Sequence, residues 1–362
     1  MRRTFEEIFR AEAYPAMSHP NADPAVNMAV ARRAGLDATD PAAASILEIG
    51  CGTGHHLLSL AKRWPEASCT GLDISARGIT RARLLARQAG ISNVRFCEVS
   101  ALEFVGKEKG YDHIIGHGVF SWVSDEVKVG MMDFIGKKLA PRGVAVVSFN
   151  VAAGWRPRMA VVEKVRAIQA AGDTDEITAL EVLHEAVEGD EKEIVADMLA
   201  KGAAVLAFDD FAPVMDAWSL GAVVKLAEAS GLRWLGDSVS GEKGSDEGDT
   251  NEGTTFRSEL FCRADAVVSE NPLEAYPMAQ RKVSVPDFPK LDAWRLLCAR
   301  EALPLVDADL KPCVFTFPQL KLLAKMDGTH SAARLSAEAK EIAPGMDFVG
   351  WLRHVAERGM FG

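Results

Sequence analysis

Three glycines at alternate positions follow directly on a short apolar run in the stretch ILEIGCGTG, residues 46–54. Glycine has no Cβ atom, so Gly50, Gly52 and Gly54 let the backbone turn tightly and lie close to a ligand. The apolar run is typical of a buried strand, and the HHLLSLAKRW that follows is typical of an amphipathic helix ending before Pro65. A strand, a glycine loop and a helix in this order predict a ligand site at the carboxyl edge of a sheet.

Apolar runs and helical patterns alternate from about Ser45 to Asn150. The alternation of strands with helices predicts a parallel sheet built from crossover units, and therefore a Rossmann-like α/β fold. The expected strands cover 45–50, 68–75, 93–99, 111–118 and 144–150, and the helices between them include 76–90 and 125–143.

Residues beyond Asn150 have a different pattern. Helical periodicity dominates four segments, 155–171, 176–187, 191–202 and 218–231. The Gly-rich, acidic segment 238–255 is expected to be a solvated surface loop, and a strand is expected to follow it at 256–268. Two short helices are expected in the C-terminal part, at 315–328 and 347–361.

Composition excludes several classes of protein. The net charge of −10 argues against sequence-independent nucleic-acid binding, which needs basic patches. The six cysteines form no CxxC pair, and the adjacent His55 and His56 have no partner at ligand spacing, so no metal site is expected. Neither a signal peptide nor an apolar run of membrane length is found, which predicts a cytoplasmic protein without membrane contact and leaves a homodimer open.

Two acids narrow the choice of ligand. A dinucleotide fingerprint, G-x-G-x-x-G, would need glycine at the position of His55. Glu48 precedes the first glycine by two residues, where it would repel a pyrophosphate but accept an ammonium group. Asp73 ends the second strand, where a carboxylate can accept hydrogen bonds from a ribose diol. S-adenosylmethionine (SAM) is a ligand that contains an ammonium group, a ribose and an adenine in this order. Loss of its methyl group gives S-adenosylhomocysteine.

LEIGCGTG and GLDIS together resemble the first two motifs of the class I SAM-dependent methyltransferases. A narrower resemblance rests on AYPAMSHP (13–20), YDHIIGHGVFSWVS (111–124), APRGVAVVSFNVAAGW (140–155) and TFRSELFCRADA (255–266). These stretches are similar to a methyltransferase family that includes bacterial protein-lysine methyltransferases. The resemblance implies a catalytic domain at 1–155, a mainly helical regulatory or substrate domain at 156–285, and a small winged-helix-like domain at 286–362.

The cofactor site is expected to include the glycine loop with Cys51, and Ile74 beside Asp73. After the third strand this class usually has an acid for the adenine amine; here Ser100 takes that place, with Ala101 next to it. His117, just past the fourth strand, is expected to contact cofactor or act in catalysis, or else to bond only to backbone.

The acceptor side is expected to draw on residues outside these motifs. Tyr14, His117 and Trp122 are the candidates for catalysis, by lining a channel for the acceptor, although core packing remains an alternative for Trp122 and its neighbour Phe120. His19, Asn150 and Trp155 are the candidates for substrate binding; turn, cap or junction roles are the alternatives.

Methyl transfer from a sulfonium needs alignment of the reacting atoms and no covalent enzyme intermediate. The resemblance and the added helical domain favour N-methylation of protein lysine. A small-molecule methyltransferase is the first alternative, and a non-catalytic SAM-binding regulatory module is the second.

Overall fold

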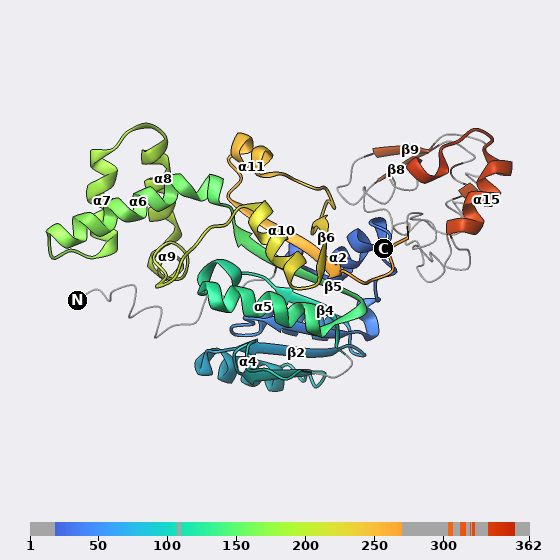
Figure 1. The fold of residues 1–362 in the computed structure, drawn as a ribbon, viewed down its shortest axis with the longest axis horizontal. Coiled ribbons are helices and arrows are strands. Elements are labelled where there is room, and N and C mark those ends of the chain that lie inside the picture. Colours follow the sequence, from blue (N-terminus) through green and yellow to red (C-terminus); the bar gives the residue numbers. More distant parts are fainter. Residues whose placement is uncertain are drawn as a thin grey trace. The chain divides into compact units, whose positions relative to one another are not determined.

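The computed structural model describes residues 19–106, 110–269, 303–306, 312–315, 319, 321–322 and 332–351. The elements of its larger unit alternate between strands and helices up to β5 and then become mainly helical (Figure 1). In chain order they are η1 (Pro20–Ala22), α2 (Pro24–Arg33), η2 (Pro41–Ala43), β1 (Ser45–Ile49), α3 (His55–Arg63), β2 (Ser68–Asp73), α4 (Ala76–Gln88), β3 (Val94–Glu98), β4 (Tyr111–Gly116), η3 (Phe120–Trp122), α5 (Asp125–Lys138), β5 (Leu139–Asn150), α6 (Ala152–Ala171), α7 (Glu176–Ala186), α8 (Gly189–Lys201), α9 (Ala203–Phe208), α10 (Leu220–Ala229), β6 (Leu232–Asp237), α11 (Asp246–Glu252) and β7 (Phe256–Arg263).

The strands form one seven-stranded sheet in the order β3-β2-β1-β4-β5-β7-β6. The pairs from β3 to β5 are parallel, and β7 lies antiparallel between β5 and β6. The strand order reverses between β1 and β4, which is where open α/β sheets bind their ligands. The predicted Rossmann-like α/β fold is confirmed, and so are its five parallel strands and the later strand that became β7.

Strand β6 was not predicted from the sequence. Its segment, LRWLGD, alternates between buried and more accessible positions, but it is short and contains a glycine and two charged residues. It forms an edge strand that pairs with β7 only, with a register irregularity between Trp234 and Gly236. Such a weak local pattern becomes a strand because β7 offers a free edge.

The boundary between α5 and β5 differs from the expected one. The helical pattern 125–143 was expected to end at Pro141 and Gly143, whereas α5 ends at Lys138 and β5 already begins at Leu139. Leu139 is buried and pairs with Tyr111 of β4. Because of this pairing, the residues expected to form the last turn of the helix belong to strand β5.

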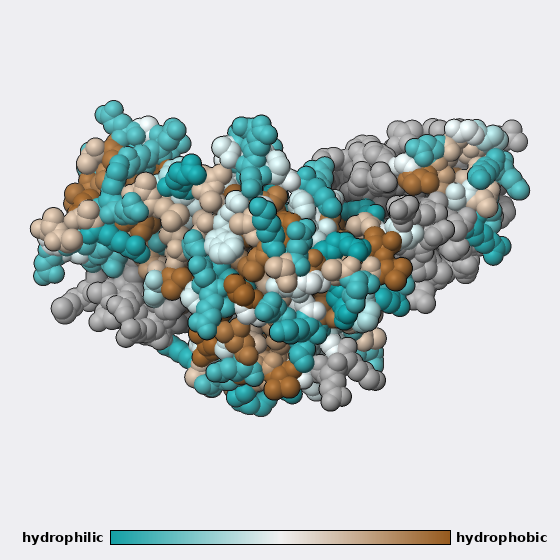
Figure 2. Space-filling model, in the orientation of Figure 1, coloured by the Kyte–Doolittle hydropathy of each residue, from teal (hydrophilic) through white to brown (hydrophobic). Residues whose placement is uncertain are grey.

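Helices α6 to α9 form a helical lobe inserted after β5 (Figure 1). Their apolar faces make a core of their own, separate from the core under the sheet, with Val161, Val165, Leu180, Val195, Met198 and Leu206 among its members. On the face shown in Figure 2, hydrophilic residues cover much of this lobe and of the sheet's helices, and the apolar residues appear in small groups. The apolar faces of α6 to α9 therefore pack against one another inside the lobe.

The acidic segment 238–255 lies largely at the surface, as expected, but part of it is a helix and not a loop. It contains helix α11, whose N-cap Ser245 accepts a hydrogen bond from Gly248 N and whose C-cap Gly253 is left-handed. Asp249 is only 1% exposed and its carboxylate is bound by Arg257 of β7. The expectation of a loop was wrong for 246–252, because a low-hydrophobicity segment can still form a helix when a buried ion pair fixes it.

The chain divides into two compact units. Among the described residues, the larger one contains 19–31, 38–106 and 110–266, and thus both the sheet and the helical lobe; the other contains 32–37 and the described residues from Val267 onward. The division into domains at 155/156 and 285/286 stays a prediction.

In the described parts of the second unit, β8 (Leu303–Val306) pairs antiparallel with β9 (Pro312–Phe315), and α15 covers Ala332–Ile342. Phe315 therefore ends a strand, although it was expected to begin a helix. Of the expected helix 347–361, residues 348–351 are helical and 352–361 lie outside the described residues. Within the described ranges, no helix has both the length and the apolar character to cross a membrane.

Candidate functional site

The glycine loop between β1 and α3 has the conformation that its sequence predicts. Gly50, Gly52 and Gly54 have φ angles of +71°, +52° and +77°, which is left-handed backbone that residues with a Cβ atom adopt only at a cost. A Cβ on Gly50 would lie 2.3 Å from Val119 Cγ2, and one on Gly54 would lie 2.7 Å from Phe96 Cζ. At Gly52 no described atom lies within 4 Å of such a Cβ, so this glycine presents bare backbone to open space.

Asp73 holds the loop in this shape. Its Oδ2 accepts a hydrogen bond from Gly52 N at 2.7 Å, and its Oδ1 accepts one from Ser75 N at 2.8 Å. A carboxylate has about four lone-pair positions, so Asp73 can accept further hydrogen bonds from a ligand. The position at the end of β2, next to the loop, is the one that the sequence predicted.

Glu48 of β1 is buried directly beneath the loop and lacks a full set of partners. Its side chain is 5% exposed, and Oε2 has no hydrogen-bond partner among the described atoms. Burial raises the pKa of Glu48 to about 8, and the charge of Asp73 adds to this, against a smaller opposing effect of the Leu57 backbone amide. A cation placed on this carboxyl group would therefore stabilise its ionised form.

The opposite side of the loop is formed by the segment after β3. Ser100 and Ala101 face the same cavity as Asp73, and the Ser100 hydroxyl accepts a hydrogen bond from Leu102 N at 3.2 Å. Ile74 also borders the cavity, with 79% of its surface exposed. Cys51 is buried in the loop, and burial raises the pKa of its thiol well above the usual range, so the thiol stays protonated.

Three imidazoles meet at another part of the cavity. The rings of His19 and His117 lie 4.0 Å apart between centroids, and the His56 ring lies 5.5 Å from that of His19. The pKa of His117 is lowered to about 3 and that of His56 to about 4, in both cases mainly by burial and to a smaller extent by the neighbouring histidines. These two rings are neutral near pH 7, so His117 is a hydrogen-bonding group and a poor general base.

Asn150 ends β5 at the same edge of the sheet. Its backbone N–H donates to Ser121 Oγ and its carbonyl accepts from Trp218 N, which fixes the residue in place. Its side chain is 1% exposed, and Nδ2 has no hydrogen-bond partner within the described structure. An amide donor held in this way is available to a bound molecule.

Two tryptophans border the cavity, whereas the phenylalanine beside one of them does not. Trp122 in η3 donates from Nε1 to Asp209 O at 3.3 Å, and Trp155 lies in the first turn of α6. Phe120 is fully buried and packs edge-on against Phe149 and Trp218, so for this residue the core alternative holds.

Except for Gly54 and Phe120, these groups line one cavity of about 1040 Å³ in the larger unit. Of the predicted site residues it brings together His19, Glu48, Gly50, Cys51, Gly52, Asp73, Ile74, Ser100, Ala101, His117, Trp122, Asn150 and Trp155. Gly54 lies at the end of the loop as the N-cap of α3, outside the lining. Tyr14 lies outside the described residues.

The helical lobe adds charged residues that no sequence pattern singled out. Arg158 of α6 pairs with Asp197 and with Asp210, and Asp210 is fully buried. Lys201 Nζ lies 3.3 Å from Asp210 and 3.8 Å from Asp209. These residues lie far apart in the sequence, and only the packing of α6, α8 and the segment after α9 brings them to one wall.

Thr255 and Phe256 also line the cavity, and for these a signal existed. Phe256 begins β7 and pairs with Asn150 at the end of β5, and its ring lies edge-on to His117 at 5.6 Å. An antiparallel strand paired with β5 has to start at the carboxyl edge of the parallel strands. Recognising TFRSELFCR as that strand would have placed its first residues at the site.

Comparison with known proteins gives a family match for part of the chain. Residues 41–200 match the family model of a methyltransferase domain. An uncharacterised protein of Rickettsia prowazekii is 33% identical over 163 residues, which make up 45% of this chain and 65% of that protein. A trans-aconitate 2-methyltransferase of Rhodopseudomonas palustris is 34% identical over 102 residues, which make up 28% of this chain and 37% of the enzyme. The chain thus spans less than two thirds of the length of these relatives.

The solved structure of PKMT2 from Rickettsia typhi matches nearly the whole chain. The match has a TM-score of 0.66 at 19% identity and covers 96% of this chain and 76% of that one. The same protein in complex with AdoHcy matches with a TM-score of 0.65 at 18% identity. Together with the strand order, this similarity shows that the fold is that of the class I SAM-dependent methyltransferases.

Proposed function

We propose that this chain is a SAM-dependent methyltransferase that methylates nitrogen on a protein substrate, with lysine as the acceptor. The observation that carries the proposal is the single cavity of about 1040 Å³, in which the glycine loop, the buried Glu48 carboxyl and Asp73 meet a wall from the helical lobe. The matched methyltransferase domain and the PKMT2-like fold support the same activity. The sequence resemblance to bacterial protein-lysine methyltransferases supports the acceptor.

The residues of the cofactor side fit SAM. Glu48 Oε2 lacks a partner and suits an ammonium group, and Asp73 has capacity for a ribose diol. Gly52 leaves space for the ligand along the loop, and Ile74, Ser100 and Ala101 would flank the adenine. When bound, SAM supplies an activated methyl group on a sulfonium, whose leaving group is a neutral thioether.

The cavity has room for more than the cofactor. About 1040 Å³ lies at the upper end of the roughly 300–1,000 Å³ of small-ligand sites, and the lining continues beyond the cofactor side to the helical lobe, where part of an acceptor would lie. The remaining wall carries His19, His117, Trp122, Asn150 and Trp155. An acceptor lysine would enter among neutral imidazoles, indole rings and one amide.

This wall provides the two conditions that an attacking amine needs. Free lysine has a pKa of about 10.4 and is charged near pH 7, but only the neutral amine can attack. Apolar and aromatic surroundings lower the pKa of a buried amine by desolvation. His117 and Asn150 would then orient the amine through hydrogen bonds, and the rings around it would exclude water.

One comparison favours a second candidate function. The trans-aconitate 2-methyltransferase methylates a small molecule, and its similarity to this chain covers 102 residues. A small-molecule acceptor would use the same cofactor side, with the helical lobe closing over it. The two functions differ in whether the labelled product is a protein.

The test uses methyl-labelled SAM, the purified protein and a desalted lysate of its own source, with proteins and small molecules separated before counting. Asp73→Asn should abolish labelling, and Asp265→Asn, which changes an exposed acid on the same molecule, should not. Label in discrete protein bands, and methyl-lysine after acid hydrolysis, would support the proposal. Label only in small molecules would favour the second function, and SAM binding without any label would refute both.

A further inference from the structure

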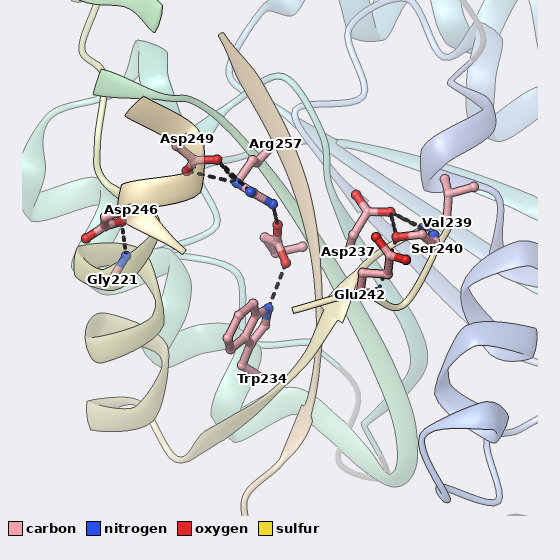
Figure 3. A network of polar contacts seen from close by, with 10 residues as sticks. Gly221, Trp234, Asp237, Val239, Ser240, Glu242, Asp246, Asp249 and Arg257 are labelled. Atoms are coloured by element: carbon pink, nitrogen blue, oxygen red, sulfur yellow. Dashed lines mark hydrogen bonds and ion pairs between the residues drawn. The ribbon is translucent and has the colours of Figure 1, made fainter. Parts of the chain in front are cut away.

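A cluster of buried charges lies beside the cavity, and the proposed chemistry does not use it. Arg257 of β7 stands between two carboxylates, Asp249 of α11 and Glu259 of its own strand (Figure 3). Its Nε lies 2.8 Å and its Nη2 2.5 Å from Asp249 Oδ1, and its Nη1 lies 3.0 Å from Glu259 Oε1. Trp234 of β6 donates from Nε1 to Glu259 Oε2 at 2.7 Å.

The cluster depends on the shape of the guanidinium group. The side chains of Asp249 and Glu259 are 2% and 0% exposed, and that of Arg257 is 14% exposed. One cation therefore serves two buried carboxyl groups. Its planar fork binds Asp249 through Nε and Nη2 and Glu259 through Nη1, a parallel geometry that the single nitrogen of lysine does not offer. Burial raises the pKa of Glu259 to about 7 even with Arg257 beside it, so removing the cation would leave two buried carboxyl groups, at least one of them charged, without their partner.

Arg257 directly follows the residues of the cavity wall. Thr255 and Phe256 line the cavity, and the Phe256 ring contacts the His117 ring edge-on. The neighbouring helix α11 is joined to this wall through Thr254, whose N–H donates to Asp249 O at 3.0 Å. The ion pair thus fixes the two ends of the turn that leads from α11 into the wall.

The same turn holds the start of α6. Thr255 O accepts a hydrogen bond from Val151 N at 2.9 Å, and Thr254 O accepts one from Gly154 N at 3.1 Å. A Cβ atom on Gly154 would lie 2.3 Å from Thr254 O, so the two backbones are in close contact. Residues 152–154 therefore begin α6 under the constraint of this turn. Trp155, the next residue of α6, lines the cavity.

We propose that Arg257 is a positioning residue for the acceptor side of the cavity. By binding Asp249 and Glu259 together, it holds the turn at 253–256, and through this turn it holds Phe256 against His117 and the start of α6 with Trp155. The inference rests on the proposed function and assigns α11 a task in it: the acidic segment anchors the acceptor wall. The cofactor side, which is formed by β1, β2 and the glycine loop, does not depend on this anchor.

Two variants and one matched pair of controls test the proposal. Arg257→Lys keeps the charge and loses the fork, and Asp249→Asn keeps the shape and loses one carboxylate. Arg263→Gln and Asp265→Asn break an exposed ion pair near the end of the same strand, away from the cavity lining. Should Arg257→Lys fail to fold, Asp249→Asn decides, because it leaves Arg257 paired with Glu259.

The first measurement needs no acceptor. Hydrogen exchange in peptides covering 151–158 should quicken by about tenfold or more in both variants, because Val151 and Gly154 lose their fixed partners. Exchange in α4 and the affinity for SAM, measured by calorimetry, should stay as in the unmodified protein. The controls should change neither quantity.

The second measurement is methyl transfer to lysate protein at saturating SAM. A wall displaced by about 1 Å should lower the rate by about 10- to 100-fold while the SAM dissociation constant is unchanged. Unchanged exchange at 151–158, an unchanged rate, or a parallel loss of SAM affinity would each overturn the proposal. If the unmodified protein methylates nothing, the proposed function fails, and the exchange result alone still decides whether Arg257 holds the wall.

Discussion

Glu48→Gln should make the ligand-free protein more stable and at the same time impair its binding of SAM. The pKa of Glu48 is raised from its ordinary value of 4.5 to about 8, mainly by burial and further by Asp73. Between these two values the folded chain binds more protons at this site than the unfolded chain does. The free energy of unfolding therefore falls as pH rises through this window, by about 1.4 kcal/mol per pH unit.

The magnitude at each pH follows from the two pKa values. Glu48 lowers the stability by about 1 kcal/mol at pH 5, about 3 kcal/mol at pH 7 and about 4 kcal/mol at pH 8. Glutamine has nearly the same shape and cannot ionise, so the variant escapes this loss. Urea unfolding of both proteins at these three pH values should show a stability difference that widens as pH rises.

Binding should change in the opposite direction. The ammonium group of SAM requires ionised Glu48, so at pH 7 binding should release close to one proton, since a group with a pKa of about 8 is mostly protonated there. Calorimetry in two buffers of different ionisation enthalpy measures this proton. In Glu48→Gln the release should vanish, and the affinity should fall by about 10- to 100-fold through loss of a charged hydrogen bond.

Two results would refute this reasoning. A stability difference that does not depend on pH would mean that Glu48 is ionised in the empty site. Equal SAM affinity in the two proteins, with no proton released by either, would mean that the ammonium group lies elsewhere.

Four further outcomes are expected. Gly52→Ala should lose about 1–2 kcal/mol of unfolding free energy, which is the cost of left-handed backbone, and should bind SAM weakly. Gly54→Ala should lose more unfolding free energy, because its Cβ would also clash with the ring of Phe96. Urea unfolding measures the stability of both variants, and calorimetry measures their SAM affinity. His117→Gln should slow methyl transfer without changing how the rate depends on pH between about pH 5 and 7, because the pKa of His117 is about 3. Rate profiles of the same shape for the two proteins would confirm this, and a pH-dependent step in the unmodified protein that is missing in the variant would contradict it. Asn150→Leu should leave thermal stability unchanged or slightly higher, since the amide Nδ2 has no described partner, but should lower the rate at saturating SAM. Asp210→Asn should cost about 2–3 kcal/mol of unfolding free energy, because Arg158 and Lys201 would lose their buried carboxylate partner and keep only Asp197 and Asp209; a loss below about 1 kcal/mol would show that the pair is solvated.

The cofactor half of the site was predictable because its residues are close together in the sequence. Glu48 and the three glycines lie within seven positions, and Asp73 ends the next strand, so strand periodicity alone brings them to one sheet edge. The glycines have the left-handed φ angles that their spacing suggested. The fold class followed from the same alternation of strands and helices, because crossover connections allow few other arrangements.

The acceptor half was predictable only in part. His19, Trp122, Asn150 and Trp155 were chosen for their places next to predicted elements or for the resemblance, and they line the cavity together with the cofactor residues. Their roles stay predictions. The lowered pKa of His117, in contrast, comes from burial beside two other imidazoles, and no sequence pattern reports burial of that kind.

The sequence by itself determined the glycine loop, the parallel sheet and the place of the cofactor acids, because these depend on the backbone preferences of single residues and on periodicity over a few neighbours. The tertiary structure decided the charged wall around Arg158, the strand β6, and the order in the acidic segment at α11. The charged wall and β6 depend on contacts between residues distant in sequence, such as those of Arg158 with Asp197 and Asp210 or of Leu232 with Arg263. Arg257 lies only eight residues from Asp249 and two from Glu259, but its pairing with both depends on the burial of these side chains in the folded chain. A buried ion pair can order a polar segment that local composition assigns to solvent, and it does so only once the surrounding chain has excluded water from it.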